Sequence, residues 1–216
     1  MTDTPMRIAY LLCSLLLLPV VSLAQTPEPI GPVAVDARVA LPRFKENADV
    51  ASALGVSTTN MPGRGLGLAG GVHWYPVRMG RVTLGLGGEI LFTGASNTLE
   101  AEDDTGVDGP TVQTHFSTVS PQVSLNFGTG KGWSYLSGGL GWGSFTTERE
   151  DDPVAEADGS IRVLNYGGGA RWFAKDHLAF TFDLRFYAIN GQEASTARPA
   201  YPKVTLMIIS AGVSFK

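Results

Sequence analysis

The stretch HLAFTFDLRFYAIN, residues 177–190, decides the fold of this chain. Its side chains alternate between an apolar set and a polar set, which is the pattern of the two faces of a β-strand. The apolar face holds Leu178, Phe180, Phe182, Leu184 and Phe186. The other face holds Ala179, Thr181, Asp183, Arg185 and Tyr187. A soluble protein buries the apolar face, whereas a barrel in lipid exposes it and encloses the charges.

Eight such strands are predicted along the chain. They cover residues 33–44, 65–75, 81–94, 113–127, 133–147, 161–173, 177–190 and 203–215. The alternation is poor in 133–147, where a bulge and a mixed interior both remain open. One face there holds Leu136, Leu140 and Trp142, and the other holds Trp133, Tyr135 and Phe145. Many of the 27 Gly lie inside strands, which is expected where a small closed barrel curves tightly.

The connections between these strands alternate in length. The long ones are residues 45–64, 95–112, 148–160 and 191–202, and the others are short hairpin turns. This rhythm is typical of outer-membrane barrels, which have long extracellular loops and short periplasmic turns. No stretch after residue 24 is long and apolar enough for a membrane helix, so a membrane protein made from it must be a closed barrel. We expect an all-β, eight-stranded antiparallel transmembrane β-barrel with both termini on the periplasmic side.

The first 24 residues have the features of a cleavable signal peptide. Arg7 precedes the apolar run IAYLLCSLLLLPVVSLA, and Ser22 and Ala24 supply the small residues of a cleavage site before Gln25. The single cysteine, Cys13, lies inside this segment, so no thiol is expected in the mature protein. The predicted organisation is a signal peptide at 1–24, a short N-terminal extension at 25–32 and the barrel at 33–216. Export through this signal to the cell outer membrane follows.

Charged residues fall on the face opposite the apolar one. They are Asp36, Arg38, Glu89, Arg171, Asp183 and Arg185, three acids and three bases. The lumen of an eight-stranded barrel is just wide enough for side chains to fill it, so charges inside must be paired. We predict a connected ion network that plugs the lumen, in which Arg171 faces in from the neighbouring strand at a height that could let it meet Asp183. A soluble lipocalin-like barrel, the rival interpretation, would instead carry a freely hydrated, lysine-rich polar face.

Aromatic residues on the apolar face lie near the ends of the strands, where a barrel crosses the two membrane interfaces. The predicted interface aromatics are Trp74, Phe92, Phe127, Trp172 and Phe215, with Phe44 and Tyr166 near the long loops.

Two segments resemble the small outer-membrane β-barrel family related to the transmembrane domain of OmpA. They are NYGGGARWFAKDHLAFTFDLRFY and the closing strand ISAGVSF. The resemblance implies a porin-like barrel in a Gram-negative outer membrane. It also implies that the barrel-assembly machinery reads a terminal aromatic residue, here Phe215, although Lys216 follows it in this chain.

Other function classes find little support. The net charge of −4 and the lack of a basic run argue against nucleic acid as a partner. The histidines His73, His115 and His177 are expected far apart, so no metal site, cofactor or catalytic set is predicted. His115 lies near Ser117 and Ser120 but has no acid placed to orient it, which leaves a lipid-modifying enzyme as the weakest alternative.

Two of the long connections are acidic. One contains Glu100, Glu102, Asp103, Asp104 and Asp108; the other contains Glu148, Glu150, Asp151, Asp152, Glu156 and Asp158. They are either solvated loops or sites for divalent ions that link them to lipopolysaccharide phosphates. We expect a monomer, surrounded by outer-membrane lipid and lipopolysaccharide, with a structural or surface-interaction role. A narrow porin-like channel for small solutes is the alternative.

Overall fold

The computed structural model describes residues 28–100, 109–152, 160–191, 193 and 203–216. The predicted signal peptide lies outside these residues, as do Glu102, Asp103, Asp104, Asp108, Glu156 and Asp158.

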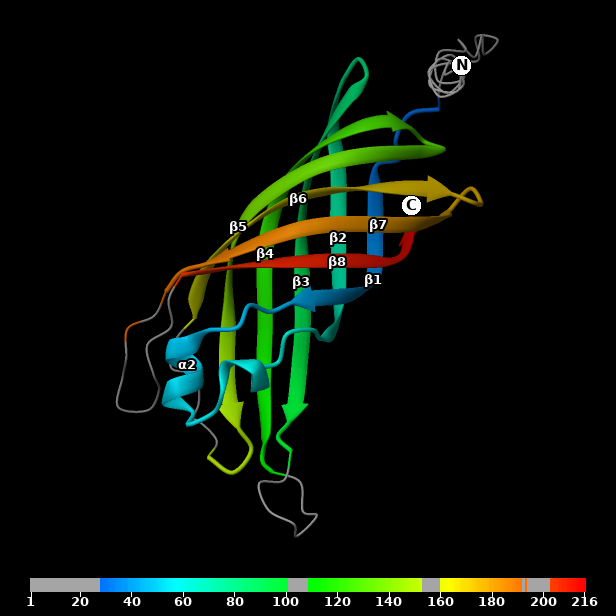
Figure 1. Cartoon of the computed structure of the whole chain (residues 1–216). Helices are drawn as coiled ribbons and strands as arrows, with labels where there is room; N and C mark the ends of the chain where they lie inside the picture. The colour runs from blue at the N-terminus through cyan, green and yellow to red at the C-terminus, as the bar shows by residue number, and fades with distance from the viewer. Residues whose placement is uncertain (1–27, 101–108, 153–159, 192, 194–202) are drawn as a thin grey trace, which may run out of the picture.

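Eight antiparallel strands, in chain order around the wall, form one closed barrel (Figure 1). They are β1 (Val33–Arg43), β2 (Leu66–Met79), β3 (Val82–Thr98), β4 (Thr111–Thr129), β5 (Gly132–Arg149), β6 (Ile161–Phe173), β7 (Leu178–Ile189) and β8 (Val204–Phe215). β8 pairs with β1, for example at Ala37 and Val213, so the sheet has no free edge. The predicted fold class is confirmed.

The short turn after β2 differs from the prediction. Residues 76–80, PVRMG, form the predicted turn between the strands expected at 65–75 and 81–94, but β2 continues to Met79 and the turn consists of Gly80 and Arg81. Pro76 lies at an irregularity between Trp74 and Val77, where the register of β2 against β3 shifts. A bulge accepts a residue without an N–H group, so the proline does not end the strand. Gly80 has a φ of 62°, which favours glycine in a tight hairpin.

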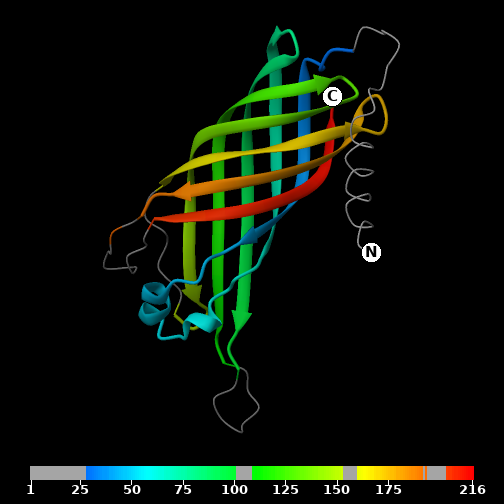
Figure 2. The ribbon, with the colours of Figure 1, turned by 45° about the horizontal axis from the view of Figure 1, so that its top comes forward.

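The strands cross the barrel at a steep tilt. In Figures 1 and 2, β6, β7 and β8 pass across β2, β3 and β4. This tilt brings the backbones of neighbouring strands close to β6 at its glycines. A Cβ added at Gly169 would lie 2.6 Å from the Tyr135 hydroxyl and closer still to the Phe182 carbonyl. The run of glycines in NYGGGARWF is therefore needed for close approach, as expected for a small barrel.

The apolar face of each strand points out of the barrel. Leu66 of β2 and Phe180 of β7 are 63% and 65% exposed, while Asp183 of β7 is buried. β5 follows the same rule: Leu136 is 62% exposed and Trp133 is 3% exposed. The register of β5 against β4 is the same before and after the middle of the strand, so β5 has no bulge there. Its inward face instead carries both aromatic and polar side chains.

The first long connection folds over the barrel mouth. It contains a short helix, α2 (Ala48–Ala53), and a 3-10 helix, η1 (Thr58–Asn60), at the end opposite the C-terminus in Figure 1. Asn47 caps α2 by accepting hydrogen bonds from the amides of Asp49 and Val50. We call residues 45–64 the cap. The sequence did not predict this helix, and no helix among the described residues is long and apolar enough to span a membrane.

Both ends of the lumen are filled by apolar side chains. The long-loop end holds one cluster, formed by Ala40, Phe44, Ala69, Leu91, Phe116, Ile161, Val163, Tyr187, Ile189, Leu206 and Ile208. The short-turn end holds a second, formed by Ile30, Ala34, Tyr75, Trp133 and Tyr135. Val50, Ala51 and Met61 of the cap pack on Val112 above the first cluster. Ile30 belongs to the predicted N-terminal extension, which thus helps to close the barrel.

Candidate functional site

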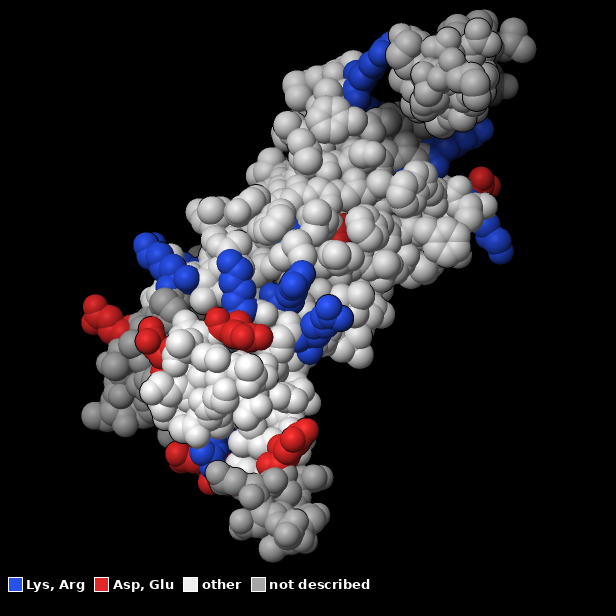
Figure 3. Space-filling model, viewed as in Figure 1, with Lys and Arg blue, Asp and Glu red and all other residues white. Residues whose placement is uncertain are grey.

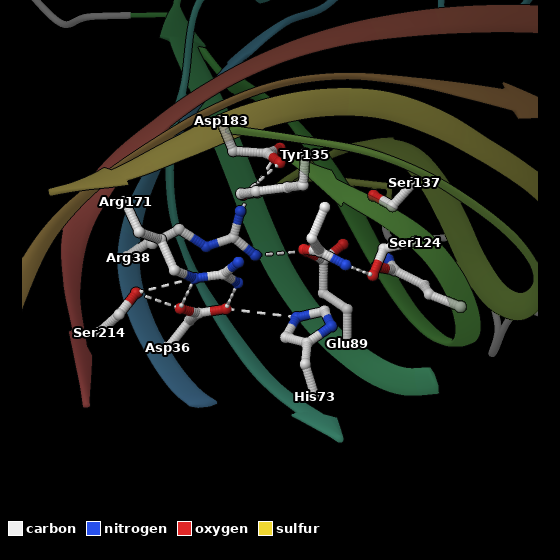
Figure 4. Close-up of polar contacts among 12 residues, drawn as sticks. Asp36, Arg38, His73, Glu89, Ser124, Tyr135, Ser137, Arg171, Asp183 and Ser214 are labelled. Atoms are coloured by element: carbon white, nitrogen blue, oxygen red, sulfur yellow. Dashed lines mark hydrogen bonds and ion pairs between the residues drawn. The ribbon is translucent and has the colours of Figure 1, made fainter. Parts of the chain in front are cut away.

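Charged side chains from several strands converge inside the lumen (Figure 4). The two apolar clusters lie toward its two ends. All six residues that the sequence analysis singled out for the lumen are here, each at most 4% exposed. They come from β1 (Asp36, Arg38), β3 (Glu89), β6 (Arg171) and β7 (Asp183, Arg185). Alternation along each strand turns them inward, because their neighbours in sequence carry the outward apolar face.

Four of these residues form a ring of alternating charge. Arg38 contacts Glu89 through Nη2, and its Nη1 lies 3.4 Å from Oδ1 of Asp183. Arg185 donates from Nη2 to Oδ2 of Asp183 at 3.0 Å, and its Nε lies 3.8 Å from Oε1 of Glu89. Each arginine therefore faces both carboxylates, and each carboxylate faces both arginines.

The other two residues form a separate pair. Arg171 binds Asp36 with two hydrogen bonds, from Nε at 3.0 Å and from Nη2 at 2.5 Å. Ser214 of β8 also donates to Asp36, and Nε2 of His73 lies 3.2 Å from its Oδ2. The bidentate geometry is the strong form of an arginine–carboxylate pair. This pair ties β6 to β1 across the lumen.

Tyr135 of β5 joins the ring to the pair. Its hydroxyl donates to Oδ2 of Asp183 at 2.9 Å, and the guanidinium of Arg171 lies over its ring, 4.4 Å from the centroid. The predicted direct contact between Arg171 and Asp183 was wrong. In the register of β6 and β7, Asp183 lies opposite Gly169 and Arg171 lies opposite Thr181, so a side chain from β5 fills the space between them.

Neutral partners complete the network. Tyr187 donates to Glu89 at 2.6 Å, and Arg185 donates to Ser137 and Asn165 at 2.7 and 2.9 Å. The sequence analysis did not assign these residues, or His73 and Ser214, to the network. The alternation of each strand does place these residues on the inward face. Many other polar residues also lie on that face, so an inward position alone does not identify the partners of the network.

The network is balanced in formal charge and closed to solvent. Its three carboxylates and three guanidiniums are all buried. An unpaired buried ion is costly, which explains why each one has an opposite charge and a neutral hydrogen-bond partner. The arrangement can hold seven strands, β1, β2, β3, β5, β6, β7 and β8, in one relative position, with β2 and β8 joined through His73 and Ser214.

The outer wall carries the aromatic residues that the sequence placed there. Trp74, Phe92, Phe127, Trp172 and Phe215 are all between 42% and 60% exposed. Tyr166 is also exposed and stacks on Phe186, with 5.6 Å between ring centroids. Phe44 was expected near this face but points inward and is 5% exposed. Phe44 continues the pattern of β1, in which the even-numbered side chains point into the barrel.

The chain matches the family model described as outer membrane protein beta-barrel domain over residues 11–216. It belongs to this family. The protein is therefore an outer-membrane β-barrel, and the wall of exposed leucine, valine and aromatic side chains is its lipid-facing surface. No protein in the curated set matches the chain.

Several solved outer-membrane barrels are similar in fold. Neisserial surface protein A is 12% identical, with a TM-score of 0.53 and coverage of 86% of this chain and 97% of that one. OprG from Pseudomonas aeruginosa is 12% identical, with a TM-score of 0.49 and coverage of 88% and 97%. The protease OmpT from Escherichia coli is 9% identical, with a TM-score of 0.43 and coverage of 90% and 99%. At such identities the likeness concerns the fold alone.

The histidines of this barrel lie apart from one another. His73 is in the lumen on Asp36, His115 is on the outer face of β4 near Gln113, and His177 bonds the Lys216 carbonyl at the short-turn end. Ser120 points inward, so it cannot partner His115. Among the described residues, no group of three or more His, Cys, Asp or Glu is arranged to hold a metal ion.

Asp151, near the long loops, forms an ion pair with Arg149. Arg149, at the end of β5, donates to Asp151 from Nε at 2.9 Å and from Nη2 at 2.6 Å, and to the Leu54 carbonyl of the cap at 3.0 Å. The hydrogen bonds from Arg149 lower the pKa of Asp151 below its ordinary value of 3.8. The acidic end of β5 is thus connected to the cap.

Proposed function

We propose that this protein is a monomeric, non-conducting outer-membrane barrel whose role is structural or surface-interacting. The filling of the lumen carries the proposal. From the short turns outward, the lumen holds an apolar cluster, the ion network and a second apolar cluster, and the cap covers the long-loop end. The cap, which lies at the long-loop end outside the lipid-facing wall, is then a part that a partner can reach.

The space left beneath the cap supports a closed lumen. The cavity lined by Phe44, Val50, Met61, Thr147 and Val204 has a volume of about 20 Å³. That is about enough for a single water molecule. A solute that passed further would have to separate Arg38 from Glu89 and Arg171 from Asp36, leaving buried charges without partners.

A narrow channel is the alternative, and one observation favours it. Several buried polar atoms in the lumen have no hydrogen-bond partner among the described residues, including Nε of Arg38, Oε1 of Gln122 and Nδ2 of Asn165. Water is the usual partner of such atoms. A chain of water molecules along these side chains would allow small solutes or ions to pass.

Conductance of the refolded mature protein in a planar lipid bilayer separates the two functions. The closed barrel gives no discrete current steps. The double variant Arg38→Ala, Glu89→Ala removes one complete ion pair and is expected to open a small, measurable conductance. The double variant Leu66→Ala, Leu68→Ala truncates two lipid-facing residues and serves as the control, which stays silent. Discrete steps from the unmodified protein would establish the channel instead.

We propose further that the protein is not an enzyme, and that the barrel-assembly machinery recognises its last strand through Phe215. Phe215 is exposed on the wall, opposite Val35 of β1 and Leu178 of β7. Phe215→Ala is expected to reduce the amount of assembled barrel in cells without lowering the urea midpoint of protein refolded in vitro. A matched change at the exposed Phe180 controls for the loss of an aromatic ring.

A further inference from the structure

Two arginines lie side by side on the outer wall at the long-loop end. Arg43, the last residue of β1, pairs with Arg64 in an isolated antiparallel bridge, so the two are direct cross-strand neighbours. Both are exposed. Like charges in this position repel each other. Neither arginine forms an ion pair with any carboxylate among the described residues, whereas all three arginines of the lumen do.

The position of this pair along the wall is that of the membrane interface. Arg43 follows Leu41 on the same outward face, and Arg64 precedes Leu66 on its own. Leu41 and Leu66 are 53% and 63% exposed and belong to the lipid-facing wall. The arginines therefore stand where that wall ends, on the side of the long loops. Figure 3 shows Lys and Arg side chains gathered in a band at this border.

The surface next to the arginines is hollow and apolar. Arg43 lies opposite Met207 of β8, and Met207 lies opposite Phe186 of β7. Phe186 and Met207 line a groove with Arg43 and Arg64 whose volume is about 770 Å³. Lys45 adds a third cation to its rim, and Glu46 is a carboxylate on the same rim. The groove thus has a cationic end toward the loops and an apolar floor against the wall.

We infer that this groove binds a phosphorylated glycolipid of the outer leaflet, of the lipid A type. A phosphomonoester carries up to two negative charges and several acceptor oxygens, which match two adjacent guanidiniums. The acyl chains of the same molecule pack against Phe186 and Met207 on the outer wall. The inference depends on the outer-membrane location and not on the closed lumen.

The test uses the refolded mature chain in zwitterionic detergent micelles, titrated with lipid A that carries two phosphates. Bound lipid is counted by native mass spectrometry. Arg43→Gln with Arg64→Gln is expected to weaken binding by about tenfold or more, because it removes both charge-assisted contacts. The control is Arg81→Gln with Lys131→Gln, which removes two exposed cations from the short turns and is expected to leave binding unchanged. Glu46→Gln is expected to strengthen binding, since it removes the opposing charge.

Further arms identify the ligand. Lipid A without its phosphates is expected to bind weakly to the unmodified protein. Its affinity should match that of intact lipid A for the double variant, because each case lacks one side of the same contact. Equal binding of phosphatidylglycerol would overturn the glycolipid assignment, and equal binding of inorganic phosphate would overturn the lipid altogether. The urea midpoint without lipid verifies folding of each variant. If the double glutamine variant does not fold, Arg43→Gln and Arg64→Gln are tested singly. Unchanged binding by both single variants would contradict the inference.

Discussion

Arg171 lies over the aromatic ring of Tyr135, while the hydroxyl of the same tyrosine donates to Asp183. A neutral side chain therefore links the two charged groups of the lumen. The link makes Tyr135 the residue at which the connectivity of the network can be tested without removing a charge.

Tyr135→Phe is expected to lower the free energy of unfolding by about 1.5–3 kcal/mol, because it leaves a hydrogen bond to a buried carboxylate unmade. The ring remains beneath Arg171. Tyr75→Phe is the matched control, since the Tyr75 hydroxyl lies 3.4 Å from Nη1 of Arg171 and accepts a weaker hydrogen bond. Urea unfolding in lipid vesicles measures both. An equal loss of unfolding free energy in the two variants would mean that the hydrogen bond to Asp183 stabilises the barrel no more than the weaker one at Tyr75.

The second prediction concerns coupling within the network. Asp36→Ala and Arg171→Ala each leave a partner ion buried alone, so each is expected to cost about 3–5 kcal/mol. The double variant should lose much less than the sum, because it removes both charges of a direct pair. The double variant Asp183→Ala, Arg171→Ala should also lose less unfolding free energy than the sum of its single variants. The difference should be smaller here, since Tyr135 lies between the two residues. Additive, mild effects throughout would indicate independently hydrated charges and favour the channel.

The third prediction concerns pH. The hydrogen bonds from Arg149 lower the pKa of Asp151 below 3.8, so their stabilising contribution is fully present above that pH. It is lost as the pH falls through the lowered pKa, when the carboxyl group is protonated. A carboxyl NMR titration of the refolded protein should show Asp151 titrating below 3.8. Arg149→Gln should return its pKa to the ordinary value. An unshifted Asp151 in the unmodified protein would show that the contact does not persist in solution.

Topology supplies the fourth prediction. The only cysteine is Cys13, inside the predicted signal peptide, so an introduced thiol can be labelled selectively. Asp152→Cys, beyond β5 on the long-loop side, is expected to react with a membrane-impermeant maleimide on intact cells. Lys131→Cys, in the short turn between β4 and β5, should react only after the outer membrane is permeabilised. The reverse pattern would place the long loops in the periplasm.

The alternation in the sequence was sufficient to predict most of the wall. The predicted 161–173 strand has the bounds of β6, because Gly-rich alternation begins and ends abruptly there. The end of β2 was not predictable because of Pro76, since a proline within a strand has the same sequence signal as a turn and only the register of β3 distinguishes them. The cap was missed because α2 has six residues, too few for a helical period to be visible.

The charged residues of the lumen could be selected from sequence because they are few and lie on one face. Their pairing could not, because it depends on the tilt and register of strands that are distant in the chain. Arg171 and Asp36 are 135 residues apart and meet only when the barrel is closed. The contribution of Tyr135 was hidden for a second reason: on β5, aromatic residues occupy both faces.

The two ends of the described chain both bond Gly130, in the turn between β4 and β5. Its amide donates to the Glu28 carbonyl at 2.6 Å, and its carbonyl accepts from Nζ of Lys216 at 2.5 Å. These contacts join the middle of the sequence to both ends of the described chain at the short-turn mouth, so each of them closes a long loop of chain. Gly130 therefore holds the first and the last described segments at the same turn, so a probe at this residue would report whether both have docked on the barrel.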